Sequence, residues 1–335
     1  MRQSDEVEPE TKVSLRPRAL RYLPVVFIVL VAVSVGFIYF CLYRPAGVGP
    51  AGPQVAASFD RVWYEGEVLL LGIGDSVTAG FGASEGFSYF ERLISNPPGD
   101  SEDVAGKNLT VVLPKLSSRN IAVSGSTSPQ HFEKQVKDLQ LHRDDVLGIV
   151  VMTTGGNDII HSYGRKPPQE GAMYEATPEQ AAPWVESFEQ RLRKMLTMIS
   201  NSFPGGCHIF LANIYDPTDG TGNPGSTGLP KWKDALWVLD KYNDVIHRCA
   251  DDYDFVHMID IREPFLGHGI HCTKIWNKNY KFSDPHYWYS LNVEDPNNRG
   301  YDALRRLFLI EIGEVFESTL GVSGEERQKP PRDTP

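Results

Sequence analysis

Short apolar runs and longer amphipathic stretches alternate along the chain. Runs of strand length occupy residues 68–73, 109–113, 146–153, 208–214 and 255–259. Stretches with helix-type spacing occupy residues 87–94, 129–139, 178–202, 233–253 and 300–316. Five strands separated by helices predict an α/β domain in which helices cover both faces of a parallel sheet.

The N-terminal part carries a longer apolar stretch, residues 23–43, without a charged residue. Its length matches the ~20 residues that cross a bilayer. The basic residues Lys12, Arg16, Arg18 and Arg21 flank it on the N-terminal side. This asymmetry predicts a single-pass transmembrane signal anchor, with residues 1–22 in the cytoplasm and the C-terminal domain outside the cytoplasm. Secretion after signal cleavage is the alternative, although cleaved signals have a shorter apolar core of ~7–15 residues.

The remaining segments predict the domain organisation. Residues 44–60 are rich in glycine and proline and are expected to form an extended, mobile linker. Residues 61–320 are long enough for one domain with a substantial core. Residues 321–335 are charged and rich in proline, which predicts a disordered tail.

A turn of small residues follows the first apolar run, and residues 72–80 read Gly-Ile-Gly-Asp-Ser-Val-Thr-Ala-Gly. A serine at a strand-to-helix turn stands clear of the sheet edge, beside free backbone N–H groups. The dinucleotide-binding pattern fails because Val77 takes the third glycine position, and no Gly-Lys-Ser/Thr follows for a phosphate loop. The turn is therefore either a plain tight turn or the site of acyl transfer through Ser76.

Two further segments favour the catalytic interpretation. Residues 120–127 read Asn-Ile-Ala-Val-Ser-Gly-Ser-Thr, and residues 153–158 read Thr-Thr-Gly-Gly-Asn-Asp. Together with the Gly-Asp-Ser of residues 74–76, they resemble in order the blocks of the SGNH/GDSL hydrolase superfamily, over residues 67–315. The resemblance implies a three-layer, flavodoxin-like sheet of about five strands and the activity of a serine esterase or lipase.

Three of the residues in these blocks fit the chemistry of ester hydrolysis. A serine hydrolase requires a nucleophile, a base and donors for the developing oxyanion. Ser76 supplies a hydroxyl and a backbone N–H, Gly125 a second N–H, and Asn157 a side-chain amide. All three follow predicted strands, and sites in parallel sheets lie at the carboxyl ends of strands. Taken singly, Gly125 and Asn157 are also ordinary turn residues.

The fourth block departs from the superfamily pattern, which reads Asp-x-x-His and often continues as Pro-Asn-x-x-Gly. Residues 295–300 read Asp-Pro-Asn-Asn-Arg-Gly, so Asp295 stands where the histidine is expected. A histidine lies upstream, where residues 284–286 read Asp-Pro-His. We therefore predict that His286 is the base and that Asp284 orients it.

The assignment of the base leaves two rivals, His268 and His271. Both lie in the glycine-containing segment of residues 265–272. A base must come within hydrogen-bond reach of the nucleophile, so the position of each histidine relative to Ser76 decides among them.

Composition limits the partners. The net charge of −10 argues against nucleic acid and against a polybasic hold on anionic lipid. The cysteines Cys207, Cys249 and Cys272 allow one disulfide, and their spacing forms no zinc site. No fingerprint of a cofactor or metal site is present, so an ester is the expected partner, besides the membrane through residues 23–43.

An aromatic segment, residues 275–289, leaves the substrate open. Its tryptophans and tyrosines are suited to stacking on sugar rings, to lining an acyl pocket, or to packing the segment onto the domain. By resemblance the substrate is an acetylated carbohydrate or a lipid. An acyltransferase on the same fold and a non-catalytic glycan-binding module are the alternatives.

Overall fold

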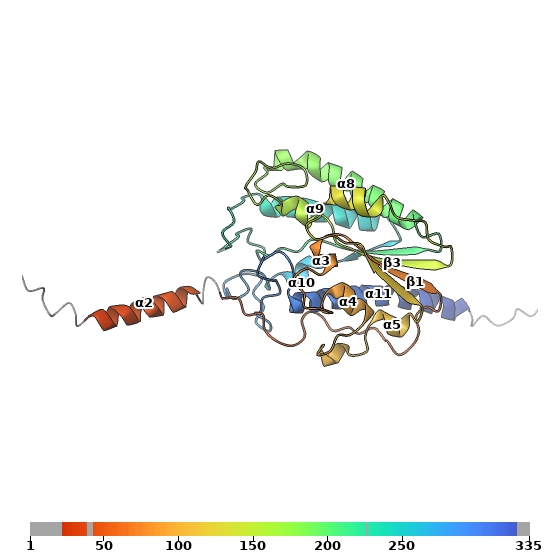
Figure 1. The fold of residues 1–335 in the computed structure, drawn as a ribbon, viewed down its shortest axis with the longest axis horizontal. Helices are drawn as coiled ribbons and strands as arrows, with labels where there is room; N and C mark the ends of the chain where they lie inside the picture. Colours follow the sequence, from red (N-terminus) through yellow and green to blue (C-terminus); the bar gives the residue numbers. More distant parts are fainter. Residues whose placement is uncertain (1–21, 39–42, 226, 327–335) are drawn as a thin grey trace, which may run out of the picture. The chain divides into compact units, whose positions relative to one another are not determined.

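The computed structural model describes residues 22–38, 43–225 and 227–326. Internal contacts divide the chain into two units, residues 1–43 and residues 44–335. In the first unit, helix α2 (Leu23–Phe37) carries Pro24 in its first turn, where the missing N–H of proline costs no hydrogen bond. The second unit contains all the other described helices and strands (Figure 1).

The transmembrane helix predicted over residues 23–43 is wrong. Helix α2 has 15 residues, against the ~20 needed to cross the hydrocarbon core. Within the part of the chain that the structure describes, no helix is both long and apolar enough to span a membrane. Positions 39–42 of the prediction lie outside the described residues. The location of the catalytic domain outside the cytoplasm stays a prediction.

Five parallel strands form one sheet in the order β2-β1-β3-β4-β5 (Figure 1). They are β1 (Glu67–Ile73), β2 (Leu116–Asn120), β3 (Val146–Met152), β4 (Cys207–Ala212) and β5 (Val256–Ile259). The predicted parallel, flavodoxin-like sheet is confirmed. In such a sheet the strand order reverses between β1 and β3, and ligands bind beyond the carboxyl ends of the strands at that point.

Helices cover both faces of the sheet because neighbouring residues of the buried strands point to opposite sides. Leu70 and Leu71 of β1 are both buried, yet they belong to different hydrophobic cores. The first core is closed by α4 (Tyr89–Ile94), α5 (Leu109–Val112) and α11 (Asn298–Glu326). The second is closed by α8 (Pro178–Asn201), α9 (Ala235–Asp251) and a π-helical turn (Phe132–Val136). Figure 1 shows these two groups of helices on opposite sides of the sheet.

Five short helical segments complete the domain. They are α3 (Ser76–Ala79), the 3₁₀ turn Glu102–Val104, α6 (Ser128–His131), α7 (Gly156–Ile160) and α10 (Arg262–Phe265). Of these, α3 and α7 start just beyond β1 and β3, so they lie at the edge of the sheet where a binding site is expected.

The second predicted strand, residues 109–113, is wrong. Leu109 and Val112 are buried in helix α5, three positions apart as on one helix face. The strand that pairs with β1 is β2, which begins at Leu116. Because β2 is a polar, mostly exposed edge strand, it carries no apolar run that marks it in the sequence.

Residues 44–60, which the sequence predicts to be a mobile linker, are packed as part of the second unit. Ala51 in this segment is only 2% exposed. The Arg299 guanidinium on α11 donates hydrogen bonds to the carbonyl oxygens of Ala46 and Pro50. This segment is therefore packed onto the domain instead of standing free of it.

The C-terminal helix is longer than the sequence predicts. Helix α11 continues to Glu326, past the expected end at residue 316 and into the expected disordered tail. Residues 327–335 of that tail lie outside the described residues. The cysteines Cys207, Cys249 and Cys272 are buried free thiols, so the structure forms no disulfide among these three.

Candidate active site

Ser76 is the first residue of α3, three positions beyond the end of β1. Gly74 joins the two elements at φ +138°, and a Cβ there would collide with the carbonyl oxygen of Thr153. The Asp75 carboxylate caps α3 by accepting from the Val77 N–H at 3.1 Å, and it accepts from the Thr153 hydroxyl at 2.7 Å. These contacts hold the half-buried Ser76 at the carboxyl edge of the sheet.

The predicted oxyanion donors lie in the loops beyond β2 and β3. Asn157 in α7 is 7% exposed, and its Nδ2 donates to the Ser126 carbonyl oxygen at 2.9 Å. Gly125 precedes Ser126 and has φ +78°. In the same loop, the Val123 N–H donates to the Gly74 carbonyl oxygen at 3.0 Å. The structure thus ties the loops of Gly125 and Asn157 to each other and to the turn that carries Ser76.

Two buried side chains that no sequence motif marks hold these loops together. His131 is fully buried, and its ring nitrogens lie 2.8 Å from the hydroxyls of Ser126 and Thr154. The Gln135 amide bonds both the N–H and the carbonyl of Gly74 at 2.8 Å. Burial lowers the pKa of His131 to about 3, so the ring is neutral. The signal in the sequence is their spacing of four, which places them on one helix face.

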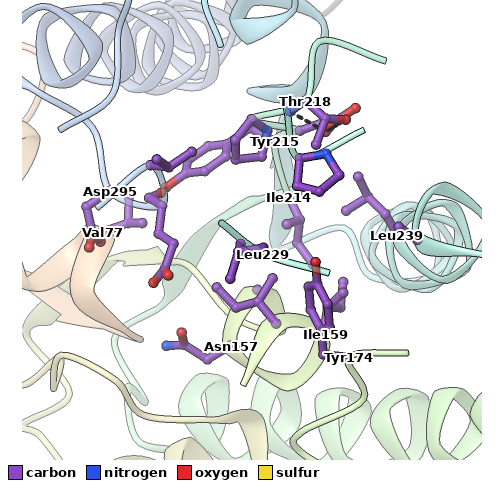
Figure 2. A pocket seen from close by; sticks show the side chains of 18 of the residues that line it. Val77, Asn157, Ile159, Tyr174, Ile214, Tyr215, Thr218, Leu229, Leu239 and Asp295 are labelled. Atoms are coloured by element: carbon purple, nitrogen blue, oxygen red, sulfur yellow. Dashed lines mark hydrogen bonds between the residues drawn. The ribbon is translucent and has the colours of Figure 1, made fainter. Parts of the chain in front are cut away.

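Ser76 and Asn157 line one cavity of about 180 Å³ beyond the carboxyl ends of β1, β3 and β4. In Figure 2, Val77 and Asp295 lie at one end of this cavity, and Tyr174 and Leu239 lie at the other. Most of its wall is apolar, including Val77, Ile159, Ile160, Tyr174, Ile214, Leu229, Trp232, Leu236, Leu239, Ile261, Ile270 and Val293.

The predicted pair of Asp284 and His286 forms, but away from this cavity. His286 Nδ1 lies 2.5 Å from Asp284 Oδ1. Arg299 donates two hydrogen bonds to the same carboxylate, at 2.9 and 3.0 Å. On the other side Gly47 is packed so close that a Cβ there would collide with the His286 ring. Neither member of the pair is among the described residues that line the cavity.

The two rival histidines have partners elsewhere. The His268 ring stacks on Trp288 with centroids 3.5 Å apart, and its Nδ1 donates to the His286 carbonyl oxygen at 2.9 Å. The His271 Nε2 lies 2.9 Å from the carbonyl oxygen of Asn223. Of the residues described around the cavity, none is a histidine.

The aromatic segment mainly packs the domain. Tyr287, Trp288 and Tyr289 are buried in the first core. Trp276 is 73% exposed. None of these four residues is among the described residues that line the cavity, so the segment forms no part of an acyl pocket there.

Asp295 is a buried carboxylate that shares the cavity wall with Ser76. It is 3% exposed and lines the same cavity. Its Oδ2 accepts from Asn292 Nδ2 at 2.5 Å, whereas its Oδ1 has no hydrogen-bond partner among the described residues. Burial raises the pKa of Asp295, and the Ser76 hydroxyl and the Asn292 amide partly offset that rise. The sequence-based site includes neither Asn292 nor Asp295.

Comparison with known proteins decides the family. The model of the GDSL-like lipase/acylhydrolase family matches residues 73–303, which is more than half of the chain. The chain belongs to this family. It is therefore an ester hydrolase of the serine type, as the resemblance of its sequence blocks predicts. None of the curated proteins matches the chain.

Several solved structures are similar to this GDSL-like hydrolase at low sequence identity. An extracellular lipase from Streptomyces rimosus is 17% identical, with a TM-score of 0.49 over 73% of this chain and 99% of that chain. A phospholipase A1 from Streptomyces albidoflavus is 19% identical, with a TM-score of 0.46 over 74% and 100%. A psychrotrophic esterase from Pseudoalteromonas is 14% identical, with a TM-score of 0.42 over 74% and 98%. Likeness at this level says nothing about the substrate of this chain.

The part of the cavity wall formed by Asp75, Glu294 and Asp295, here called the acidic corner, carries three carboxyl groups. Burial raises the pKa of Asp75 to about 6, and the neighbouring charge of Asp295 adds to the rise. Burial also raises the pKa of Glu294, which lines the cavity beside them. The described lining residues include no lysine, arginine or histidine that would balance these carboxylates. An anionic group brought next to Ser76 would therefore be repelled.

Proposed function

We propose that this GDSL-like hydrolase cleaves uncharged carboxylic esters with an apolar acyl group, through an acyl-enzyme on Ser76. The apolar cavity of about 180 Å³ that Ser76 and Asn157 line carries the proposal. An apolar cavity of about 150 Å³ holds one benzene molecule, so this one suits an acyl group of roughly six carbons. The acidic corner favours a neutral ester over one with an anionic acyl chain.

The shape of the cavity favours a lipid-like ester over an acetylated carbohydrate. An acetyl group would leave most of the apolar wall in contact with water. Each further methylene buried there contributes about 0.8 kcal/mol, or roughly fourfold in kcat/KM where the gain is realised in the transition state.

The proposed reaction is ester cleavage through a nucleophilic serine and three hydrogen-bond donors. The Ser76 hydroxyl attacks the ester carbonyl, whose oxygen gains negative charge. The backbone N–H groups of Ser76 and Gly125 and the amide of Asn157 donate to that oxyanion. The alcohol leaves, and water then releases the acid from Ser76.

The test is the hydrolysis of p-nitrophenyl esters by the full chain, with acyl groups from acetyl to decanoyl. We expect kcat/KM to rise with chain length to an optimum near roughly six carbons. Ser76→Ala is expected to abolish turnover and labelling by a fluorophosphonate. A best activity on the acetyl ester, or turnover that survives Ser76→Ala, would contradict the proposal.

A matched pair of substitutions ties the optimum to the cavity. Leu229 lies in the cavity wall (Figure 2). Leu141 is 73% exposed. Leu229→Trp fills part of the cavity and should move the optimum to shorter chains, whereas Leu141→Trp should leave it unchanged. An optimum that Leu229→Trp does not move would place the acyl chain elsewhere.

A further inference from the structure

We propose that Asp295 is the general base of this hydrolase, and that Asn292 holds it in place. The pair Asn292–Asp295 then replaces the Asp–His pair of the family. This inference rests on the proposed role of Ser76 as the nucleophile.

The sequence places the pair in register with the fourth family block. That block reads Asp-x-x-His-Pro-Asn-x-x-Gly. Residues 292–300 read Asn-Val-Glu-Asp-Pro-Asn-Asn-Arg-Gly, so every spacing is kept and only the two catalytic positions differ. Asn292 stands at the position of the family aspartate and Asp295 at that of the histidine, so no insertion is needed to align the block.

The structure keeps the geometry as well as the spacing. Asn292 Nδ2 bonds Asp295 Oδ2 at 2.5 Å, as an orienting residue bonds a base. The Asn292 side-chain oxygen accepts from the Asp295 N–H at 3.1 Å, and the Ser290 N–H donates to the Asp295 carbonyl oxygen at 2.7 Å. Asp295 is therefore fixed at both its backbone and its side chain.

The turn that carries the pair is strained. Val293, between Asn292 and Asp295, takes φ +71°. A β-branched residue rarely adopts that conformation, because its side chain is crowded against the backbone there. Such strain persists where surrounding contacts enforce it, and it clusters at functional sites.

The free oxygen of Asp295 supplies the acceptor that the reaction requires. Oδ1 is buried and has no hydrogen-bond partner among the described residues, although a buried carboxylate oxygen normally has one. The Ser76 side chain acts on this carboxylate and lowers its pKa against the effect of burial. A carboxylate made more basic by burial takes a proton more readily at neutral pH.

The other titratable groups around Asp295 leave it the best placed acceptor. The charge of Asp295 raises the pKa of each of these groups, which are Asp75, Glu294, Tyr163, Tyr215 and Tyr301. Asp75 is committed to the cap of α3 and to Thr153. Burial raises the pKa values of the three tyrosines, so they stay protonated.

The proton balance is complete without a histidine. Asp295 takes the proton of the Ser76 hydroxyl as Oγ bonds to the ester carbon. The protonated Asp295 gives that proton to the leaving alkoxide as the ester C–O bond breaks. In the second half a water molecule passes a proton to Asp295 while its oxygen attacks the acyl-enzyme. Ser76 Oγ then recovers the proton as it leaves, and the carboxylic acid is released.

The experiment compares Asp295→Asn with Asp284→Asn in the full chain on the best p-nitrophenyl ester. Both substitutions remove one carboxylate and keep its shape. Asp295→Asn should lower kcat by about 10²–10⁴-fold with little change in KM, since that is the usual worth of a general base. Asp284→Asn and His286→Ala should retain kcat within a few fold. Thermal melting of each variant separates a catalytic loss from unfolding.

A double variant supplies the rescue. Asn292→Asp with Asp295→His rebuilds the family block, and it should regain at least tenfold in kcat over Asp295→Asn at pH 8. Its kcat/KM should then fall as the pH drops below roughly 6.5, the ordinary pKa of histidine. A purely structural role for Asp295 would not produce that profile.

Distinct outcomes identify which statement fails. Retained kcat in Asp295→Asn, or its loss in His286→Ala, would overturn Asp295 as the base while leaving Ser76 as the nucleophile. A parent chain that hydrolyses no ester of the series and does not react with a fluorophosphonate would overturn both proposals together.

Discussion

Two neighbouring segments of this hydrolase, residues 284–286 and residues 292–295, each carry a pair of polar residues. The two pairs differ in residue type and in position relative to the cavity. Asp284 and His286 have the residue types of a catalytic pair, but neither is among the described residues that line the cavity, and Asp284 accepts hydrogen bonds from Arg299. Asn292 and Asp295 are not the residue types of the family's Asp–His pair, but they line the same cavity as Ser76. On the proposal that Asp295 is the base, position relative to the nucleophile marks a base better than residue type does.

The contacts of the first pair suit a structural role. Asp284 accepts two hydrogen bonds from Arg299, which also binds the carbonyl oxygens of Ala46 and Pro50. The pair therefore belongs to a cluster of hydrogen bonds that holds residues 44–60 against α11.

Apart from the substitutions at Ser76 and Asp295, removal of an oxyanion donor should give the largest loss of kcat. Asn157→Ala is expected to lower kcat by about 10²–10³-fold, because the amide stabilises charge that develops only in the transition state. Asn201→Ala, at the exposed C-terminal end of α8, is the matched control and should leave kcat unchanged. The measurement is kcat on the best p-nitrophenyl ester. A rise in KM with unchanged kcat would show that Asn157 binds the substrate without stabilising the oxyanion.

The sequence predicts the fold well where apolar runs are long. The central strands β1 and β3 are buried on both faces, so their apolar runs mark them clearly. The edge strand β2 has no such run, and the apolar residues just before it form α5 instead. Edge pairing is decided by a neighbouring strand, which sequence periodicity does not show.

The candidate site is predictable to the same extent. Ser76 and Asn157 follow strands directly, so the sheet itself brings them to one edge. Asp295 and the pair of Asp284 and His286 lie in long connections between β5 and α11, where no regular element fixes their direction. Spacing within the fourth family block is the better guide there, and it points to Asn292 and Asp295.

Breaking the structural cluster should affect stability and leave activity intact. Arg299→Met removes both hydrogen bonds to Asp284 and leaves its carboxylate without that cation. Loss of one partner from a fully buried ion pair costs about 3–5 kcal/mol, and a quarter of the Asp284 side chain is exposed, so we expect about 2 kcal/mol. The measurements are denaturant unfolding and kcat at a temperature where the variant is folded.

A surface pair provides the matched control for that substitution. Arg143 and Asp145 form an ion pair whose side chains are 68% and 60% exposed. Arg143→Met should leave the free energy of unfolding nearly unchanged, because solvent screens this exposed ion pair. A stable Arg299→Met variant with lost kcat would reverse the comparison, because it would make the first pair the catalytic one.

The smallest effect should come from a change of charge within the second pair. Asn292→Asp places a carboxylate against Asp295 and removes the amide donor, and both changes raise the pKa of Asp295 further. A base must be ionised to act, so kcat/KM falls as the pH drops through that pKa, and its acid limb should move up by about 1 pH unit. On the acid limb of the profile this shift lowers kcat/KM by roughly tenfold, whereas kcat/KM at high pH is unchanged. Asn292→Ala removes the donor without adding charge and should shift the limb less. If the profiles of Asn292→Asp and the parent coincide, the group that titrates is not next to Asn292, and Asp295 loses its claim to be the base.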